Sequence, residues 1–423
     1  MPKENTYNIA SLCSVADLLM GQSPPGETYN KEGKGYPLLN GPTEFGLDHP
    51  IPCLWTTAPT KICEKGDLLF CVRGTTTGRM NWADQAYCIG RGLCAIRAKT
   101  GFLDTNYIYY SLIYELSRLL SLCSGSVFLN LSRNDLEEFE IRWSPNSQER
   151  AKNTSILMYI ENKIKLNQET NKTLEAVGGA VFKRWFVDFE FPNQESKPYK
   201  SSGGKMIDSD MGLIPNEWKH DKMSSLFTVT DGTHDSPKKT EPGYYLITSK
   251  HVKEQEIDFS QAYKISETDF IEINRRSRVN TNDILVTMIG TVGNILLVQE
   301  NTIDFAIKNI GLFKSSERPD LFEYIFYYLK SSKSKDYVRT RTSGTTQGYL
   351  TLESIRDFPV LIPSVDLISN FKKIVNPLLE KIWLNRNQTK TLQNVRTALL
   401  PKLMSGKIRV PIRKEEMETT DNA

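Results

Sequence analysis

The sequence predicts a mixed α/β (α+β) protein in two copies: two globular domains, each followed by a long helix, with the two helices forming an antiparallel coiled coil. Three observations lead to this prediction. Short motifs of the first half return in the second half at a nearly constant offset. Each half begins with β-like runs punctuated by glycine and proline, and each ends in a long stretch with heptad periodicity. The chain is therefore expected to have a pseudo-two-fold internal duplication.

The duplication extends over most of the chain. The motif at residues 66–69 recurs at 282–285, 216 residues later, and each copy is followed by a Gly-Thr pair. The motif Lys-Ile-x-Leu-Asn at 163–167 recurs at 381–385, which is 218 residues later. A solenoid repeats every ~20–50 residues, so a period this long indicates two copies of a whole domain with its helix.

Each globule is expected to combine short strands with one aromatic-rich helix. The expected strands include residues 68–72, 93–97 and 129–131 in the first globule, and 284–288, 295–298 and 350–352 in the second. The expected helices are residues 106–120 and 320–335. This mixture within each copy predicts a mixed α/β globule.

Both long helices carry a coiled-coil pattern. Apolar residues repeat every seven positions, with Leu157 and Ile164 in one helix matching Val375 and Ile382 in the other. For either helix alone, packing on its own globule would be at least as good an explanation. An asparagine at the same seam position of both helices favours mutual pairing, because a buried asparagine costs stability but fixes register. Asn167 and Asn385 are therefore expected to set the alignment.

The domain boundaries follow from these patterns and from a Ser/Gly/Pro-containing stretch near residues 196–205. The predicted segments are a first globular domain at 1–145, a first spacer helix at 146–186, a linker at 187–210, a second globular domain at 211–363, a second spacer helix at 364–405 and a C-terminal tail at 406–423.

Composition excludes several classes of protein. With 39% hydrophobic and 24% charged residues, the chain has enough apolar side chains for a core and is not of the disordered class. No apolar run is long enough for a membrane span, so no membrane partner is expected. The seven cysteines show no CxxC spacing, which favours reduced thiols, a cytoplasmic location and no Cys/His zinc site.

The usual short catalytic signatures are missing. The sequence contains no GxxxxGK[ST] phosphate loop, no GxGxxG after a strand, no GxSxG elbow and no NPP[FY] sequence of an amino-group methyltransferase. Two Glu-x-Lys spacings, at 161–163 and 195–197, fit solvated charge pairs better than a nuclease site. A binding or scaffolding role is therefore favoured, and no catalytic or metal-ligating residue is expected.

Basic and polar side chains gather in loops of both globules. Since 53 basic residues face 50 acidic ones, such clusters matter more than the net charge of +3. Arg and Lys neutralise phosphates, and Arg, Asn, Gln and Thr can read base edges, although ordinary solvated loops remain an alternative. The expected DNA-contacting residues are Arg73, Thr75, Thr76, Arg79 and Asn81 in the first globule, and Arg275, Arg276, Arg278, Lys335, Arg339, Arg341, Thr345 and Gln347 in the second.

Two globules held apart by helices could address two half-sites of a duplex. A helix of about 40 residues is about 60 Å long at ~1.5 Å per residue, which is enough to separate half-sites about one DNA turn (~34–36 Å) apart. Because the two globules differ in sequence, the expected target is asymmetric and split by an unread gap.

Several stretches resemble the specificity (S) subunit of type I restriction–modification systems. Residues 15–26, with Gly21-Gln22-Ser23-Pro24-Pro25, are similar to the Gly-x-Ser-Pro-Pro stretch that opens many recognition domains of that family. Residues 211–219 resemble the entry to its second domain, and the prolines at 145 and 363, each before a long helix, match its transition into the spacer helices. The second half departs from the pattern, because residues 231–237 replace Gly-x-Ser-Pro-Pro.

The resemblance implies a non-catalytic reader of double-stranded DNA with two target recognition domains. It further implies two modification subunits that methylate adenine with S-adenosylmethionine, and restriction subunits that use ATP and Mg, so that no cofactor binds this chain itself. Two other hypotheses stay open: a stand-alone DNA-modifying or DNA-cutting enzyme with an unrecognised site, and a coiled-coil scaffold without a nucleic-acid role.

Overall fold

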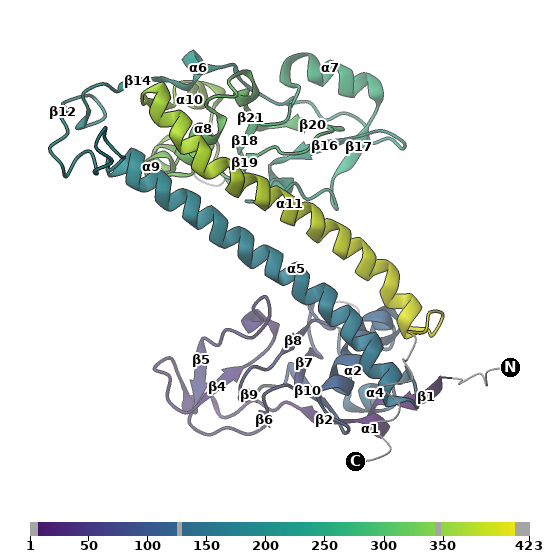
Figure 1. The fold of residues 1–423 in the computed structure, drawn as a ribbon. Coiled ribbons are helices and arrows are strands. Elements are labelled where there is room, and N and C mark those ends of the chain that lie inside the picture. Colours follow the sequence, from purple (N-terminus) through teal and green to yellow (C-terminus); the bar gives the residue numbers. More distant parts are fainter. Residues whose placement is uncertain (1–6, 125–128, 343–347, 411–423) are drawn as a thin grey trace. The chain divides into compact units, whose positions relative to one another are not determined.

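A computed structural model describes residues 7–124, 129–342 and 348–410. Its contacts divide the chain into two compact units, one formed by residues 1–166 and 388–423 and the other by residues 167–387. The two divisions fall inside the long helices α5 (Ser147–Phe182) and α11 (Val365–Met404). Each unit therefore consists of one globule with one end of each helix (Figure 1).

The globule of the first unit contains a four-stranded antiparallel sheet with the order β2-β10-β7-β8. Its strands are β2 (Ala16–Met20), β10 (Leu93–Ala98), β7 (Leu68–Cys71) and β8 (Met80–Trp82). A five-stranded sheet consists of β3 (Tyr29–Asn30), β5 (Leu54–Thr56), β4 (Tyr36–Leu39), β9 (Tyr87–Ile89) and β6 (Ile62–Cys63). Strand β1 (Asn8–Ser11) pairs with β11 (Glu140–Trp143). The helices are α1 (Leu12–Val15), α2 (Phe102–Tyr114), α3 (Leu116–Leu120) and α4 (Arg133–Glu137).

The second unit repeats this plan. Its four-stranded sheet has the order β15-β21-β18-β19, with β15 (Val229–Asp231), β21 (Ile310–Phe313), β18 (Ile284–Thr287) and β19 (Ile295–Leu297). A three-stranded sheet consists of β17 (Tyr263–Ile265), β16 (Tyr244–Thr248) and β20 (Phe305–Lys308), and the short pairs are β14 (Lys219–Lys222) with β22 (Pro359–Ile362) and β12 (Met206–Ile207) with β13 (Ile214–Pro215). The helices are α6 (Met223–Leu226), α7 (Glu267–Ser277), α8 (Phe322–Lys330), α9 (Ser332–Arg341) and α10 (Leu352–Arg356).

The main elements of the two globules correspond, which confirms the predicted duplication and the α+β fold class. Both have the same strand order in the four-stranded sheet, and both have one parallel pair in the second sheet, β4 with β9 and β16 with β20. Tyr107 on α2 and Tyr324 on α8 donate their hydroxyls to the carbonyls of Arg142 and Leu361, which lie on equivalent strands. Helix α7 is an addition of the second globule.

Hydrophobic packing explains why these segments fold as they do. The strand β7 is fully buried, because one face of its sheet packs on α2 and the other on the second sheet. The aromatic helix α8 is buried on all sides in a large cluster with the end of α5 and the start of α11. Phe371 and Phe182 are members of that cluster, with ring centroids 5.9 Å apart.

Two expected strands are wrong. At 129–131 and 350–352 the structure has isolated bridges, Arg73 with Asn130 and Ile289 with Tyr349, and then the short helices α4 and α10. The side-chain hydroxyls of Ser132 and Thr351 cap these helices by accepting a backbone N–H at 3.1 Å. Capping of the following turn therefore prevails over the β-like Leu-x-Leu pattern.

Residues 187–210 were expected to form a linker, and they fold onto the second unit rather than forming an extended tether. Helix α5 ends in a π-helical turn at Lys183–Val187, and Phe189 and Phe191 behind it are buried. The ring of Phe191 stacks between Tyr199 and Trp218, with centroid distances of 4.5 and 5.6 Å. This aromatic stack attaches the segment to the core of the second unit.

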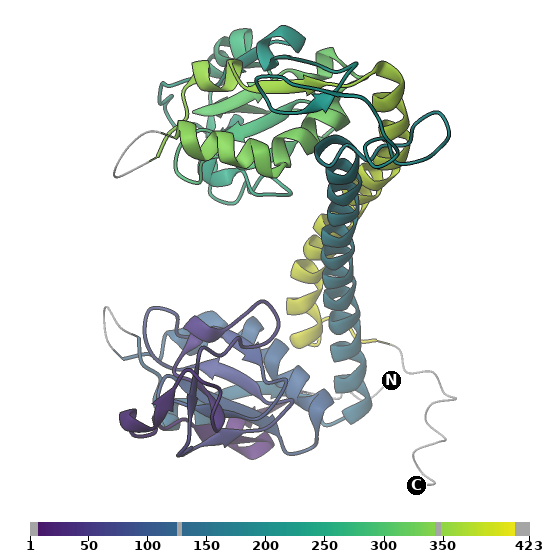
Figure 2. The same cartoon turned by 90° about the vertical axis from the view of Figure 1, so that its left-hand side faces the viewer.

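Within each unit the portions of α5 and α11 run antiparallel (Figures 1 and 2). In the second unit, Asn167 donates its side-chain amide to the carbonyl of Asn385 at 3.4 Å. Asn385 in turn donates its side-chain amide to the amide oxygen of Asn171 at 2.9 Å. All three asparagines are buried, so the polar layer expected from Asn167 and Asn385 includes Asn171 as its third member.

In the first unit, charged residues continue the pairing of the two helices. Arg396 of α11 lies 3.5 Å from Glu161 of α5, and Tyr110 of the globule donates its hydroxyl to the same carboxylate at 2.8 Å. Burial raises the pKa of Glu161, although these two partners oppose that shift.

None of the described helices is long and apolar enough to cross a membrane.

Candidate nucleic-acid interface

A loop at one end of a four-stranded sheet holds Arg73, Thr75, Thr76 and Arg79, and other residues predicted to contact DNA lie on helices α7 and α9. In the first unit, the backbone N–H of Gly21, just after β2, donates to Leu93, and the N–H of Gln22 donates to Ile89. In the second unit, Gly232 and Thr233 after β15 donate in the same way to Ile310 and Ile307. These bonds make the Gly-x-Ser-Pro-Pro segment and its replacement in the second half structurally equivalent.

Both segments require glycine at their first position because the backbone of a neighbouring strand comes very close. A Cβ on Gly21 would lie 2.2 Å from the carbonyl oxygen of Gly90, and one on Gly232 would lie 2.2 Å from that of Ile307. Such distances are shorter than van der Waals contact, so a side chain would displace the loop. The glycines therefore fix where the following polar residues emerge.

In the first unit, the turn after β7 presents Arg73, Thr75 and Arg79 on the surface. Arg73 donates from Nε to the side-chain oxygen of Asn130 at 3.1 Å, which ties the turn to the segment before α4. Arg79 donates from Nη1 to the carbonyl of Pro42 at 3.2 Å. Thr76 is half-buried beside the sulfur of Cys71. These residues thus lie on one turn, with their orientations set by neighbouring loops.

Asn81 does not belong to this surface. Its side chain is buried, and its amide nitrogen donates to the carbonyl of Gly46 at 3.0 Å while its oxygen accepts the N–H of Trp82 at 2.7 Å. In this structure Asn81 therefore has no exposed amide to offer to DNA. Its amide is used to hold the loop at residues 41–50 against β8.

The arginine cluster at 275–278 separates onto two sides of α7. Arg275 and Arg278 are exposed and line a hollow of about 790 Å³ together with Asn274. Arg275 also pairs with Glu272 at 2.7 Å on the same helix. Arg276 points to the opposite side, toward the end of β15, because neighbouring helical residues differ in direction by about 100°. The three arginines therefore do not form a single patch.

Helix α9 carries the remaining predicted basic residues. Lys335, Arg339 and Arg341 are exposed, with Arg339 3.1 Å from Asp336 and Arg341 over the ring of Tyr337. The side chain of Val338 meets the turn after β18 at Gly293, which places the last turn of α9 beside that turn. Thr345 and Gln347 lie outside the described residues.

Sequence reasoning missed the residues around Asp231. His234 and Asp231 were not selected, although His234 lies 3.0 Å from the Asp231 carboxylate and is exposed, as expected of a surface loop. A charged residue within an apolar strand, followed by glycine, was the available signal. Another histidine of the second unit, His251, is buried, and burial lowers its pKa.

At the other end of both sheets, paired charges serve the fold. Arg97 contacts Asp67 at 2.6 Å in the first unit, and Lys314 contacts Asp283 at 2.6 Å at the equivalent place in the second. Both aspartates are buried and both also accept a backbone N–H from their own turn.

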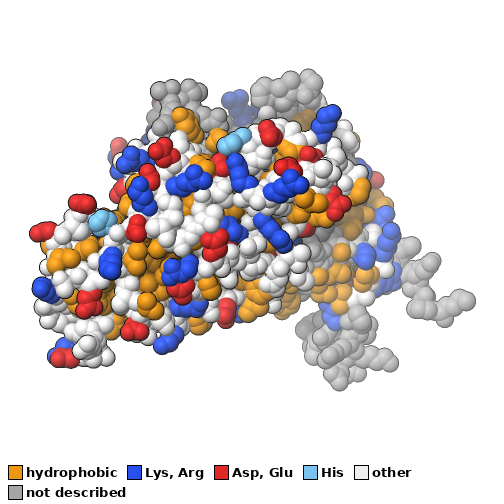
Figure 3. Space-filling view, turned by 90° about the horizontal axis from the view of Figure 1, so that it is seen from above, with side chains coloured by type: hydrophobic (Ala, Val, Ile, Leu, Met, Phe, Trp, Pro, Cys, Tyr) orange, Lys and Arg blue, Asp and Glu red, His pale blue; other side chains and the backbone are white. Residues whose placement is uncertain are grey.

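Figure 3 shows lysine and arginine side chains gathered over the middle of the face of the second unit, interspersed with acidic ones.

Among the residues that the structure describes, no three His, Cys, Asp or Glu side chains are grouped so as to hold a metal ion.

The comparison with family models matches residues 5–176 and 215–393 to the type I restriction modification DNA specificity domain. The chain belongs to this family. The two matched regions correspond to the two copies seen in the fold, so the DNA specificity domain occurs twice in this chain.

Relatives and a solved structure agree with this assignment. The MjaIX specificity subunit of a type I restriction enzyme from Methanocaldococcus jannaschii is 26% identical over 360 residues, covering 83% of this chain and 79% of that one. The HindI specificity subunit from Haemophilus influenzae is 21% identical, covering 82% and 88%. The S subunit of a type I restriction–modification system from M. genitalium has the same fold, with a TM-score of 0.59 at 17% identity over 98% of both chains.

One similarity is more local. The MjaX specificity subunit from M. jannaschii is 39% identical over 134 residues, which cover 32% of this chain and 31% of that relative. As a member of this specificity family, the chain is a DNA specificity protein rather than a structural coiled coil.

Proposed function

We propose that each globule of this specificity protein recognises one half of a split, asymmetric DNA target. The observation that carries the proposal is the pair of equivalent sheet ends, which share their backbone and differ in chemistry. Where the first unit has Met20 and Arg73, the second has Asp231 and Ile289 at the corresponding positions. A shared backbone with different side chains suits two readers of different base sequences.

The long helices would set the distance between the two half-sites. Helix α5 contains 36 residues and α11 contains 40, and neither is interrupted. Such helices are about 54 to 60 Å long at ~1.5 Å per residue. The unread gap would then depend on helix length, and the recognised bases would depend on the globules.

The chain itself would not catalyse a reaction. Two modification subunits would supply methyl transfer from S-adenosylmethionine to adenine, and restriction subunits would supply the steps that need ATP and Mg. The outward sides of the helices offer apolar side chains for docking such partners, including Tyr159, Leu166 and Leu384, which are all exposed. An assembly of this kind would act in the cytoplasm, on chromosomal and incoming DNA.

Methylation mapping of a genome tests the proposal directly. The chain is co-expressed with the modification subunit encoded with it, and methylated adenines are compared with those of a strain lacking this chain. A split, asymmetric motif that appears only with the chain is the expected result. A symmetric motif, or methylation that persists without the chain, would contradict the proposal.

Deleting one heptad from each helix tests the role of helix length. The deletion removes about 10 Å of helix at ~1.5 Å per residue, or about three base pairs of DNA. The two half-sites should stay the same while the gap between them changes. A control variant with seven residues deleted from the tail beyond 410 should leave both halves and the gap unchanged. An unaltered gap after the helix deletion would count against helices as spacers.

The enzyme alternative makes a different prediction. If the chain had a catalytic site of its own, the purified chain with Mg²⁺ and S-adenosylmethionine would cut or methylate DNA without any partner. We expect binding without either reaction, with an affinity that falls as salt concentration rises.

A further inference from the structure

The end of β15 holds a buried acid between two exposed basic side chains. The side chain of Asp231 is only 3% exposed, yet its two oxygens face different partners. Oδ1 accepts from Nη2 of Arg276 on α7 at 3.1 Å, and Oδ2 lies 3.0 Å from Nε2 of His234 on the loop after β15. The two partners come from separate elements, so Asp231 is the contact that joins them.

The surrounding backbone fixes the geometry of this trio. Nη2 of Arg276 also donates to the carbonyls of Asp231 and Gly232, at 3.2 and 2.9 Å. The other ring nitrogen of His234, Nδ1, lies 2.7 Å from the side-chain oxygen of Asn309. The N–H of Asn309 in turn donates to the carbonyl of Thr233 at 3.1 Å, which ties the loop after β15 to the turn between β20 and β21. Both basic groups are therefore held from more than one side.

Arg276 and His234 nevertheless face outward. Their side chains are 58% and 67% exposed, although the carboxylate that holds them is almost completely buried. Both residues line two adjacent hollows of about 610 and 360 Å³ and form the ridge between them. The smaller hollow is also bounded by Tyr349.

The fold does not need this trio. In the first unit, the residue equivalent to Asp231 is Met20, and the same backbone bonds after the strand form without any charged group there. Helix α7, which supplies Arg276, is absent from the corresponding part of the first unit as described. A buried charge also costs free energy unless it is paired. A feature that is costly, confined to one copy and presented outward is better explained by recognition than by stability.

We propose that Asp231 is a positioning residue that holds Arg276 as a donor for base edges in the half-site of the second recognition domain, with His234 anchoring the other oxygen of its carboxylate. This inference rests on the proposed function. Among the described residues, no hydrogen bond engages Nε or Nη1 of Arg276. Each of these N–H groups can donate singly to an acceptor on a base edge, such as O6 or N7 of guanine in the major groove.

Charge alone predicts the opposite effect of removing Asp231. The Asp231→Asn substitution deletes a negative charge from a surface that meets anionic DNA, so uniform electrostatics would strengthen binding to every duplex. If Asp231 positions Arg276 with His234 as its anchor, the side-chain amide that replaces the carboxylate can accept from only one of these two partners, because its nitrogen is a donor. Specific binding should then weaken while non-specific binding does not.

The experiment uses the full chain assembled with its modification subunit and duplexes carrying the target found by methylation mapping. Binding is measured for the intact target, for duplexes with either half scrambled, and for a duplex with both halves scrambled. For Asp231→Asn and Arg276→Ala, affinity for the intact target should fall about ten-fold, which is at the lower end of the range for contacts to base edges. Affinity should be unchanged for the duplex whose second-domain half is already scrambled.

Three controls separate positioning from other roles. Glu272→Gln removes a carboxylate that pairs with Arg275 on the same helix, and it should not weaken binding to the intact target, because it deletes the same charge without releasing Arg276. Met20→Leu alters the equivalent position of the first unit and should not affect the second-domain half. The double variant Asp231→Asn/Arg276→Ala should bind as Arg276→Ala does, since the two residues act through one contact.

Several outcomes would overturn the inference. The first is a gain of affinity of Asp231→Asn for all four duplexes. The second is an equal loss of affinity for both half-sites, which would indicate partial unfolding. The third is a double variant whose loss equals the sum of the two single losses. A loss that is uniform across sequences, with a salt slope lowered by about one, would assign Arg276 to a phosphate and also reject base reading. If the wild-type assembly fails to distinguish any half-site, the proposed function fails. If the wild-type assembly distinguishes the half-sites and Asp231→Asn has no effect, this inference is rejected and the proposed function stands.

Discussion

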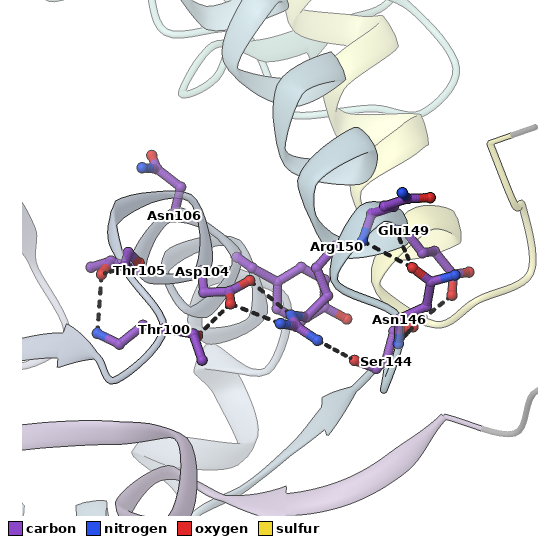
Figure 4. Close-up of polar contacts among 12 residues, drawn as sticks. Thr100, Asp104, Thr105, Asn106, Ser144, Asn146, Glu149 and Arg150 are labelled. Carbon is purple, nitrogen blue, oxygen red and sulfur yellow. Dashed lines mark hydrogen bonds and ion pairs between the residues drawn. The ribbon is translucent and has the colours of Figure 1, made fainter. Parts of the chain in front are cut away.

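The ion pair between Asp104 and Arg150 joins the first globule to the long helix, and its removal has a predictable cost. Asp104 lies on α2 and Arg150 on α5, with Nε and Nη2 of the guanidinium 2.7 and 2.8 Å from the two carboxylate oxygens (Figure 4). Nη1 donates to the carbonyl of Ser144 at 2.7 Å, and the guanidinium lies over the ring of Trp143 at 4.3 Å. Both side chains are less than 10% exposed.

The Arg150→Met substitution leaves the buried carboxylate of Asp104 with Thr100 as its remaining hydrogen-bond donor. Breaking a buried pair in this way costs about 3–5 kcal/mol, because the uncompensated charge stays in the interior. For a cooperative unit of this size, a destabilisation of 1 kcal/mol lowers the melting temperature by about 2–4 °C. We therefore expect the melting temperature of the first unit to fall by about 6–20 °C.

The second unit indicates which double variant should restore stability. The residues equivalent to Asp104 and Arg150 are Leu321 and Ile368, which are both buried in one hydrophobic cluster. Replacing a buried ion pair by well-packed apolar residues is often neutral or stabilising. Asp104→Leu/Arg150→Ile should therefore recover most of the loss of the single variant.

The effect should also depend on pH. Burial opposes ionisation of Asp104, but hydrogen bonds from Arg150 and Thr100 outweigh it, so the pKa of this carboxyl is lowered in the folded protein. A lowered folded-state pKa contributes stability above the unfolded pKa of about 3.9, and this contribution is lost as pH falls through the folded value. Without Arg150 the buried carboxylate of Asp104 becomes protonated at a higher pH, which removes the uncompensated charge. The deficit of Arg150→Met should therefore be largest near neutral pH and smaller near pH 4.

Differential scanning calorimetry of wild type, Arg150→Met and the double variant at about pH 7 and 4 measures these differences. The reasoning would be refuted if Arg150→Met melted within about 2 °C of wild type at neutral pH. It would also fail if the double variant were no more stable than the single one.

Two further predictions concern the helix pair and the loop after β15. Asn385→Leu should lower the melting temperature, because the buried amide oxygen of Asn171 loses its donor at a cost of about 1–3 kcal/mol of stability. The double variant Asn171→Leu/Asn385→Leu removes both amides and should raise the melting temperature. Equal melting temperatures of the two variants would contradict a shared polar layer. Gly232→Ala should cost about 1–3 kcal/mol in urea unfolding, because its Cβ would meet the carbonyl oxygen of Ile307 at 2.2 Å. The control Gly179→Ala in α5, where a Cβ meets nothing within 4 Å, should stabilise by up to about 1 kcal/mol, and a neutral Gly232→Ala would show that the loop can relax.

Local patterns were sufficient for the repeated architecture. The constant offset between the halves predicted two copies of one domain, and heptads with Asn167 and Asn385 predicted the helix pair, because both are properties of spacing along the chain. The strands β7 and β18 were found from short apolar runs that a buried strand requires. The same reasoning misplaced 129–131 and 350–352, where hydroxyl capping of the next helical turn prevails over strand propensity.

The site depended far more on tertiary structure. Sequence composition selected Asn81 for its side chain, but only the packed fold shows that its amide is used by the carbonyl of Gly46. It also grouped Arg276 with its neighbours, whereas the helix turns Arg276 toward a different partner, Asp231, 45 residues away along the chain. The sequence by itself determined how many copies there are and where the two long helices lie. Which polar groups remain available was decided by contacts between distant residues, because hydrogen bonding within the fold removes a donor regardless of its residue type.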